Sequence, residues 1–406
     1  MRILFLSPVS PWPVFSGGRQ RLYHLLKGLA QHHEITLVSF FDGEAARSGL
    51  LALGDALGIH IEMTPFIGKR QLLFHRHGMA VALNQVRARR QGLPADVAAW
   101  RQPAMDRLLQ RVLSAQPYDI LQIEAPFLAS YAHAHHARAT LLSAYDIPSV
   151  ALARRAMLLP PGRKRAGLQT QAQRWRRYEA RIFPRFQAII AMSESDAAFI
   201  RRQVPNARAE VVPNGVSSRA FSPAPPREEV HRLLFVGSPG HAPNLDAACW
   251  LMTAIWPRLR RRHPHLRLML VNLDHPRVKK CRTSGVEMMG RLPDLQAAYR
   301  QADVALAPLR AGSGTRLKLL EAFAAGAPVV STSIGYEGLE VTPGEHLLRA
   351  DSAPAFADAV TQLVQSRALR QRLASQARKL VVARYDWRLS IAKLGMIYDA
   401  LLEHPK

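Results

Sequence analysis

The chain has 406 residues, of which 48% are hydrophobic, and its 55 Lys and Arg against 30 Asp and Glu give a net charge of +25 at pH 7. This length is too great for one ordinary core and predicts two or three domains. Two cysteines argue against a disulfide scaffold and fit a reducing cytoplasm, and no signal peptide or apolar run of roughly 20 residues is evident, so we expect a soluble or peripheral protein.

The first half of the chain alternates apolar runs with stretches of helical periodicity. Residues 2–7, 34–41 and 187–192 have the continuous apolar character of strands buried on both faces of a parallel sheet. The alternation predicts a doubly wound α/β domain, whose ligands lie at the carboxyl edge of the strands. At the first such edge Gly17 and Gly18 open a helix, and this pair is either a tight turn or a close approach of backbone to ligand.

Two acidic residues end further apolar runs in this half. Glu124 closes residues 119–124, and Asp146 closes residues 143–146. Both are candidates for polar groups at the ligand-binding edge, and Asp146 is a candidate catalytic residue. No three-glycine dinucleotide fingerprint follows the first strand, which argues against a nicotinamide enzyme.

Residues 222–229 have the proline-rich, polar composition of an interdomain linker. We therefore predict an N-terminal domain over 1–222, a second domain over 223–385 and a C-terminal helix over 386–406. The second domain has the same alternating pattern, which predicts a second parallel sheet with strands at 266–272, 286–290, 303–308 and 328–332.

The segment 308–332 carries the strongest functional signal. It follows an apolar run, so its first residues leave the carboxyl edge of the sheet. Gly312 and Gly314 permit torsions that other residues resist, and the backbone N–H groups around Ser313 can approach an anion. Thr315 is the expected N-cap of the helix that follows.

That helix combines a core-facing stripe with a charged face. Arg316 and Lys318 add full charges to the positive helix N-terminus, a combination that suits a diphosphate, and Glu321 can accept hydrogen bonds from ribose hydroxyls. The other interpretation is an ordinary strand–loop–helix whose glycines only make a turn. The stripe itself comprises Leu317, Leu320 and Ala324.

Residues 308–332 closely resemble the C-terminal signature of family 4 retaining glycosyltransferases, the group 1 class with the GT-B fold, in the variant that reads Gly-Ser-Gly-Thr-Arg-Leu-Lys before a glutamate. Glu321 matches the second of the two family glutamates, which the resemblance implies binds ribose. Gly314 stands at the position of the first.

The resemblance covers nearly the whole chain. Residues 233–237 and 243–246 look like the opening strand and helix of the family's second domain, where many relatives have an arginine in place of Ser238. The diphosphate would then rely on Arg316 and Lys318. Tyr145 replaces the histidine of the family's His-Asp pair.

The resemblance implies two Rossmann-like domains facing a central cleft, with the acceptor on the N-terminal side, the donor on the C-terminal side, and the last helix packing back on the N-terminal domain. The implied activity is retaining hexosyl transfer from a nucleotide-diphosphate sugar to a glycan or lipid-linked acceptor in cell-envelope polysaccharide or glycolipid synthesis. The implied catalytic residues are Arg316, Lys318 and Asp146. The implied donor-binding residues are Gly17, Gly18, Gly237, Gly312, Ser313, Gly314, Thr315 and Glu321.

No cofactor and no essential metal are expected, because no Asp-x-Asp motif is evident and the cationic residues would replace the metal. The histidines at 133, 135 and 136, like those at 75 and 77, lack carboxylates or cysteines at ligand spacing, so a solvated surface explains them better than a metal site.

The excess positive charge attracts anionic surfaces. Basic clusters occur at 87–90, 154–155, 163–165, 174–177 and 258–262, which fits a peripheral position on the inner face of the cytoplasmic membrane or arginines that merely coat helices. The helix expected over 169–183 carries Trp175, Tyr178 and Ile182 on one face, either interfacial or core, and the resemblance favours core.

Three alternative functions remain. A nucleotide-sugar 2-epimerase shares the two-domain architecture, and a non-catalytic basic binding protein would retain the fold. A nucleic-acid-binding protein would share the charge, but no nucleic-acid motif or interleaved aromatic platform is present.

Overall fold

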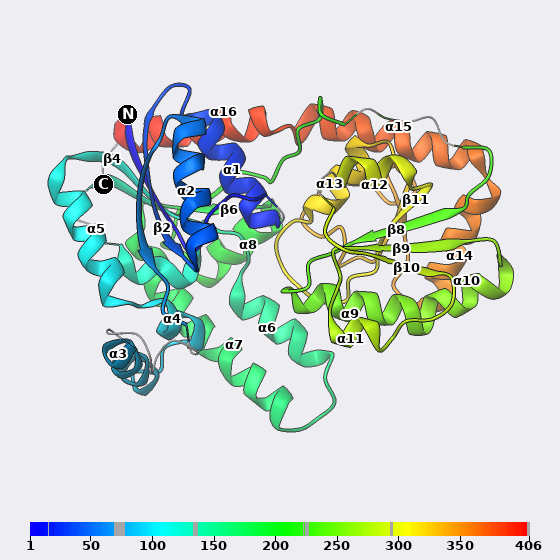
Figure 1. Ribbon diagram of the computed structural model, residues 1–406, viewed down its shortest axis with the longest axis horizontal. Coiled ribbons are helices and arrows are strands. Elements are labelled where there is room, and N and C mark those ends of the chain that lie inside the picture. Colours follow the sequence, from blue (N-terminus) through cyan, green and yellow to red (C-terminus); the bar gives the residue numbers. More distant parts are fainter. Residues whose placement is uncertain are drawn as a thin grey trace. The chain divides into compact units, whose positions relative to one another are not determined.

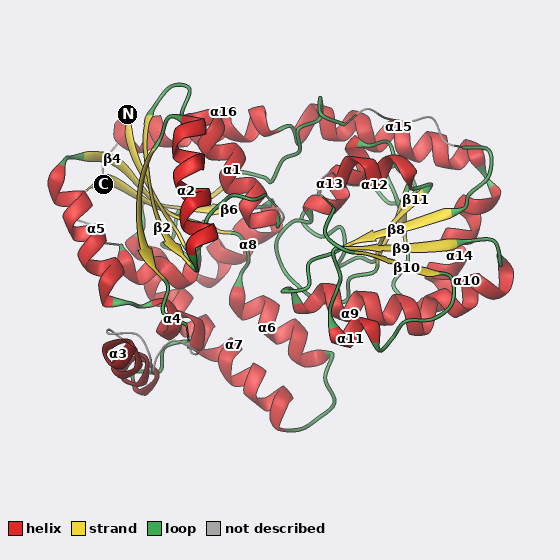
Figure 2. Cartoon of the chain, in the orientation of Figure 1, coloured by secondary structure: helices red, strands yellow, loops and turns green. Residues whose placement is uncertain are grey.

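The computed structural model describes residues 1–14, 16–68, 78–132, 137–221, 223, 227–292 and 295–403. The chain divides into two compact units. The N-terminal unit comprises Met1–Pro213 with Ser390–Lys406, and the C-terminal unit comprises Asn214–Leu389. Each unit is a parallel sheet with helices on both faces (Figures 1 and 2).

The sheet of the N-terminal unit has strand order β3-β2-β1-β4-β5-β6-β7 in the described residues. The side chains of strand β1 alternate between two cores: Leu4 and Leu6 face one hydrophobic cluster, whereas Ile3 and Phe5 face the other. This two-sided burial explains why the strands read as continuous apolar runs. The strands are β1 Arg2–Ser7, β2 Glu34–Phe41, β3 His60–Pro65, β4 Tyr118–Ile123, β5 Ala137–Ala144, β6 Ala188–Ala191 and β7 Ala209–Val211.

Helices of this unit cover both faces of its sheet (Figure 2). The helix α16, Trp387–Glu403, contributes Leu394, Ile397 and Tyr398 to the core cluster that contains Ile3, so the end of the chain belongs to this unit. The other helices are α1 Gly17–Leu29, α2 Glu44–Leu57, α3 Gly78–Arg90, α4 Ala95–Trp100, α5 Pro103–Ala115, the 3-10 turn Pro126–Tyr131, α6 Pro148–Met157, α7 Arg163–Ile182 and α8 Glu194–Gln203.

The sheet of the C-terminal unit has strand order β10-β9-β8-β11-β12-β13 within the described ranges. Strand β8 lies between β9 and β11, so the strand order reverses there, and such a switch point is where doubly wound sheets bind ligands. The strands are β8 Arg232–Val236, β9 Arg267–Val271, β10 Val286–Met289, β11 Val304–Ala307, β12 Val329–Ser331 and β13 Leu348–Arg349. Strands β9 to β12 lie at the predicted positions.

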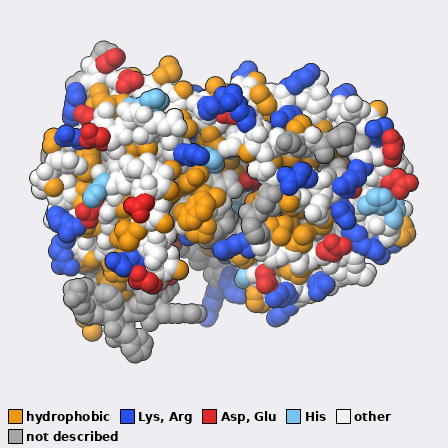
Figure 3. Space-filling view, turned by 45° about the horizontal axis from the view of Figure 1, so that its top comes forward, with side chains coloured by type: hydrophobic (Ala, Val, Ile, Leu, Met, Phe, Trp, Pro, Cys, Tyr) orange, Lys and Arg blue, Asp and Glu red, His pale blue; other side chains and the backbone are white. Residues whose placement is uncertain are grey.

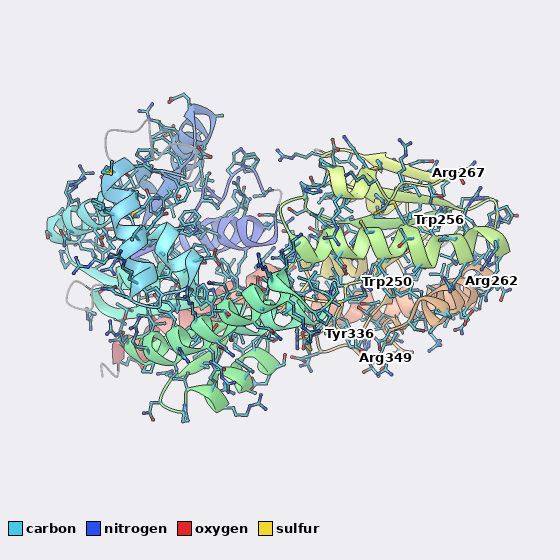
Figure 4. The ribbon with its side chains drawn as sticks, turned by 90° about the horizontal axis from the view of Figure 1, so that it is seen from below. Trp250, Trp256, Arg262, Arg267, Tyr336 and Arg349 are labelled. Carbon is cyan, nitrogen blue, oxygen red and sulfur yellow. The ribbon has the colours of Figure 1, made fainter. Side chains whose placement is uncertain are left out.

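A long helical run crosses one face of this sheet. It joins α9, Ala242–Trp250, through one π-helical turn, Leu251–Ile255, to α10, Trp256–Arg262, and Figure 4 labels Trp250, Trp256 and Arg262 along it. Trp256 is fully buried and fixes the run against the core. The remaining helices are α11 Pro276–Lys279, α12 Leu295–Gln301, α13 Leu317–Ala324, α14 Ala353–Gln365 and α15 Arg367–Arg384.

The boundary between the units falls after Pro213, earlier than the predicted residue 222. The reason is local pairing: the Val216 N–H donates to the Tyr385 carbonyl at 2.7 Å, and Ser218 Oγ donates to Asp386 Oδ2 at 2.5 Å. These bonds hold residues after Pro213 within the C-terminal unit. Of the predicted linker 222–229, residues 222 and 224–226 lie outside the described residues.

Candidate functional site

The loop that follows β11 is shaped by its glycines. Gly312 has φ +123° and Gly314 has φ +72°, a backbone conformation that other residues rarely adopt. A Cβ at Gly312 would also lie 2.6 Å from Arg316 Nη2, so a side chain would displace that guanidinium. The loop therefore requires glycine at this position for both torsion and space, and Ser313 between the two glycines is buried.

The side chain of Arg316 lies inside this loop. Its Nη1 donates to the carbonyl oxygens of Ser313 and Gly314, the latter at 2.7 Å, and only 9% of the residue is exposed. Arg316 thus braces the loop from within as well as adding positive charge. It is also the N-cap residue of α13, so the prediction that Thr315 caps this helix is wrong.

Thr315 has a different role. Its Oγ1 accepts a hydrogen bond from Asn214 Nδ2 at 2.8 Å, and Asn214 is the first residue of the C-terminal unit. The threonine side chain therefore ties the loop to Asn214. Hydrogen bonding at this site therefore links segments that lie far apart in the sequence.

Lys318 lies in the first turn of α13 in an enclosed position. Its Nζ donates to Asn244 Oδ1 at 2.8 Å and lies 4.6 Å from the centroid of the Phe235 ring. Burial is the main cause that lowers the Lys318 pKa to about 7, with the neighbouring Arg316 charge acting in the same direction and Glu321 opposing both. An ammonium with this pKa changes charge near neutral pH, so an anion bound beside it would draw a proton onto it.

Glu321 lies one turn further along α13 and is 7% exposed. Its Oε2 accepts a hydrogen bond from the Tyr299 hydroxyl at 3.1 Å, and the same hydroxyl lies 3.0 Å from the Lys318 carbonyl oxygen. Burial raises the pKa of Tyr299 well above its usual value, and the Glu321 charge adds to this, so the phenol stays protonated as a donor. The carboxylate is therefore held in place by α12.

A further contact fixes the start of the loop. Arg310 donates through Nε and Nη2 to the two carboxylate oxygens of Asp246 at 3.0 and 2.8 Å, and its Cζ lies 5.1 Å from the Trp250 ring centroid. This bidentate pair joins the loop to α9. At the end of β8, a Cβ on Gly237 would lie 2.5 Å from the Leu273 side chain, so that glycine provides close packing.

The predicted residues of the N-terminal unit form a separate group. Gly17 is the first residue of α1, and a Cβ on Gly18 would lie 3.8 Å from the Tyr145 ring. The Arg21 guanidinium carbon lies 5.9 Å from the centroid of the same ring. Asp146 follows Tyr145 and is exposed. The glycine pair and the Tyr145–Asp146 segment thus meet at one edge of this sheet, as their places after β1 and β5 predict.

Glu124 directly follows β4, but its side chain is in the interior. It is fully buried, and its Oε1 accepts from Ser143 Oγ at 2.9 Å and from Gln122 Nε2. Burial raises the pKa of Glu124, and burial lowers the pKa of the nearby Arg21 to about 10. The Tyr398 hydroxyl of α16 donates to Gln122, so this network holds the last helix on the sheet. The interpretation of Glu124 as a ligand-facing group is wrong.

Sequence reasoning missed four polar residues of the C-terminal site. Asn244 and Asp246 stand in a stretch that the sequence analysis identified only as the start of a helix. Their polar side chains, close to the switch point of the sheet, are the one sequence signal that could have indicated a role in the site. No signal in the sequence connects the others to the loop. The four are Asn214, Asn244, Asp246 and Tyr299.

Burial decides whether the apolar face of the helix at 169–183 is interfacial or core. Trp175, Tyr178 and Ile182 are all buried in the core of the N-terminal unit, which confirms the core interpretation. Lys and Arg side chains are distributed over the surfaces of both units (Figure 3). Among the described helices, none is long and apolar enough to cross a membrane.

Metal ligands do not gather in the residues that the structure describes. No group of three or more His, Cys, Asp or Glu side chains occurs there. The histidines at 75, 77, 133, 135 and 136 lie outside the described residues.

Comparison with known proteins identifies two matching family models. "Glycosyl transferases group 1" matches residues 230–366, and "Glycosyltransferase Family 4" matches residues 15–220. Phosphatidyl-myo-inositol mannosyltransferase of Mycobacterium leprae is 28% identical over 207 residues, which are 47% of this chain and 53% of that protein. A glycogen synthase of Mycobacterium tuberculosis is 29% identical over 206 residues, 47% of this chain and 48% of that protein. The chain therefore spans about half the length of the curated relatives it matches.

Solved structures share the fold over the whole chain. Sucrose-phosphate synthase from Thermosynechococcus elongatus superposes with a TM-score of 0.73 at 16% identity, covering 99% of each chain. HepE of Anabaena, solved in complex with UDP-glucose, gives a TM-score of 0.69 at 15% identity, covering 99% of this chain and 100% of that one. At this identity the likeness establishes the architecture alone.

Proposed function

The chain belongs to the group 1 glycosyltransferases, and on that premise we propose that it transfers a hexose from a nucleotide-diphosphate sugar to a glycan or lipid-linked acceptor in cell-envelope polysaccharide or glycolipid synthesis. The predicted family and the GT-B fold are confirmed. The observation that carries the proposal is the placement of Lys318 and Glu321 on α13, directly after the glycine loop at the switch point of the C-terminal sheet.

Each part of this site suits a different part of the donor. The N–H groups of the Gly312–Thr315 loop and of the start of α13 suit the diphosphate, because they carry partial positive charge. Lys318 adds a full charge when it is protonated, and Arg316 holds the loop in shape while contributing its own. Glu321, fixed by Tyr299, suits a ribose hydroxyl, because a carboxylate only accepts hydrogen bonds.

Transfer with retention then needs no carboxylate nucleophile. The bond between the anomeric carbon and the donor phosphate oxygen breaks, and the acceptor oxygen bonds to the same face of that carbon. The acceptor proton passes to the departing phosphate oxygen. Lys318, Arg316 and the α13 N-terminus would stabilise the negative charge that develops there. Asp146 remains the candidate catalytic residue of the N-terminal unit, and Gly17 and Gly18 remain candidates for donor binding.

Because these cations supply the charge stabilisation, we propose that no divalent metal is essential. Transfer should therefore continue in excess EDTA. Loss of activity in EDTA, with recovery on adding Mg²⁺ or Mn²⁺, would contradict this part of the proposal.

The test of the function begins with a thermal shift panel of UDP-, GDP-, ADP-, dTDP- and CDP-linked hexoses. A stabilising nucleotide sugar should lose its effect in Glu321→Ala but keep it in Glu345→Ala, whose carboxylate is 53% exposed. Product analysis by NMR then reports the anomeric configuration, and inversion would refute the retaining mechanism. Conversion of the donor sugar to its 2-epimer without an acceptor would establish the epimerase instead. No response to any nucleotide would favour a non-catalytic protein.

The N-terminal unit offers a surface for a lipid-linked acceptor. Helices α6 and α7 pack against each other as a hairpin (Figure 1), and at its tip Met157 and Leu158 are 67% and 37% exposed. Exposed Arg155, Arg163 and Lys164 flank these apolar side chains. Exposed apolar side chains close in the sequence to exposed cations suit an anionic lipid surface, and this combination supports a peripheral position on the inner face of the cytoplasmic membrane.

Cosedimentation with phosphatidylglycerol-containing vesicles tests this surface. Binding should weaken with salt and be lost in the double variant Met157→Ser, Leu158→Ser, as well as in Lys164→Glu. Arg261→Glu, at an exposed position on α10 of the other unit, is the matched control and should bind normally. Equal loss in that control would mean that net charge alone drives binding.

A further inference from the structure

The two cysteines of the chain meet in the fold. Cys249 lies in the last turn of α9, and Cys281 lies just after α11. Their sulfur atoms are 2.7 Å apart, although both residues are free thiols. The carbonyl oxygen of Arg277 lies 3.6 Å from Cys249 Sγ and 3.4 Å from Cys281 Sγ. One backbone turn thus holds both thiols side by side.

This geometry is close to that of a disulfide. A sulfur–sulfur bond is about 2.0 Å long, so the two atoms need to approach by less than about 1 Å. Both residues are partly exposed, which lets a small oxidant reach them. Burial and the neighbouring Cys281 thiol raise the pKa of Cys249 to about 12, which disfavours the Cys249 thiolate as the first attacking group.

We propose that Cys249 and Cys281 form a reversible thiol–disulfide couple that reacts with small-molecule disulfides. The Cys281 thiolate attacks one sulfur of the oxidant, forming a mixed disulfide and releasing one thiolate. Cys249 then loses its proton and attacks the Cys281 sulfur, releasing the second thiolate. The protein loses two electrons and two protons, and the oxidant becomes two thiols.

The bond would act on the loop of the candidate site. It joins α9 to the turn just after α11, and α9 carries both Asn244, which contacts Lys318, and Asp246, which holds Arg310. The oxidised and reduced forms should therefore bind nucleotide sugar with different Kd values. This second part rests on the proposed function, whereas formation of the couple does not.

Mass spectrometry of the full-length folded protein tests the couple. Equilibration with oxidised glutathione should remove two hydrogens from the wild type without a lasting adduct, and dithiothreitol should restore them. Cys249→Ser should instead hold one glutathione on Cys281, because the resolving thiol is absent. A wild type that keeps two alkylatable thiols, or that carries two glutathiones, would overturn the couple.

Nucleotide-sugar titration of the oxidised and reduced wild type tests the link to the loop. The Cys249→Ser, Cys281→Ser double variant is the control, and its Kd should not respond to either reagent. Equal Kd values for the two wild-type forms would overturn the link while leaving the couple intact. Failure of either form to bind any nucleotide would count against the proposed function instead.

Discussion

Lys318 provides the most direct test of the proposed donor site. Its ammonium has a pKa of about 7, and only the charged form attracts a diphosphate. The affinity for a nucleotide sugar should therefore fall as pH rises through 7, because a growing fraction of the free protein must first take up a proton. Replacing Lys318 by Met should remove both the attraction and the pH dependence.

The magnitudes follow from this pKa and from the strength of charged hydrogen bonds. The charged fraction of Lys318 drops from about 0.9 at pH 6 to about 0.1 at pH 8, so Kd should rise roughly tenfold over this range. A hydrogen bond to a charged group contributes about 1.5–3 kcal/mol, so Lys318→Met should weaken binding at pH 6 by about 10-fold to 150-fold.

Isothermal titration calorimetry measures both effects. A nucleotide sugar is the right ligand, because its esterified diphosphate does not titrate between pH 6 and pH 8, unlike a free nucleoside diphosphate. Titrations in buffers of different ionisation enthalpy should show proton uptake of about half a proton at pH 7 for the wild type and none for Lys318→Met. Lys379→Met, at an exposed position on α15, is the control. A wild-type Kd that is equal at pH 6 and pH 8, with Lys318→Met binding equally well, would refute the reasoning.

Three further changes have defined outcomes. Tyr299→Phe should weaken binding of a ribonucleotide sugar by about 3-fold to 10-fold, because one hydrogen bond to Glu321 is lost. A 2′,3′-dideoxy analogue should bind the wild type and the variant equally. An equal loss of affinity for both ligands would argue against the view that Tyr299 positions the Glu321 carboxylate. Gly312→Ala should lower nucleotide affinity, because φ is +123° and the new Cβ would clash with the Arg316 side chain. An unchanged affinity in the thermal shift panel would contradict the requirement for glycine at this position. Trp175→Ala should destabilise the N-terminal unit by about 3–5 kcal/mol in urea denaturation, and a change below about 1 kcal/mol would mean that its burial in α7 contributes little.

Sequence periodicity predicted the elements well. Residues 2–7 and 34–41 are strands with the predicted bounds, because strands buried on both faces leave a continuous apolar run that needs no knowledge of partners. The glycine loop and the helix carrying Lys318 and Glu321 were also predicted from local signals. Torsion, charge and helical spacing are properties of neighbouring residues, and the sequence records them directly.

The contacts within the site depend on the fold. Nothing local indicates that Arg316 turns inward to brace its own loop, or that Asn214 donates a hydrogen bond to Thr315. The same holds for Glu124: its place at a strand end suggested a position near the ligand, but its side chain is buried and bonded to Ser143 and Gln122.

The sequence by itself therefore determined the two doubly wound sheets and the glycine loop proposed to bind the donor. Only the tertiary structure decided that Asn244 contacts Lys318, that Tyr299 holds Glu321 and that Cys249 lies against Cys281. The physical reason is distance along the chain: strand and turn signals depend on near neighbours, whereas each of these pairs joins segments far apart in the sequence that only the packing of the C-terminal unit brings together.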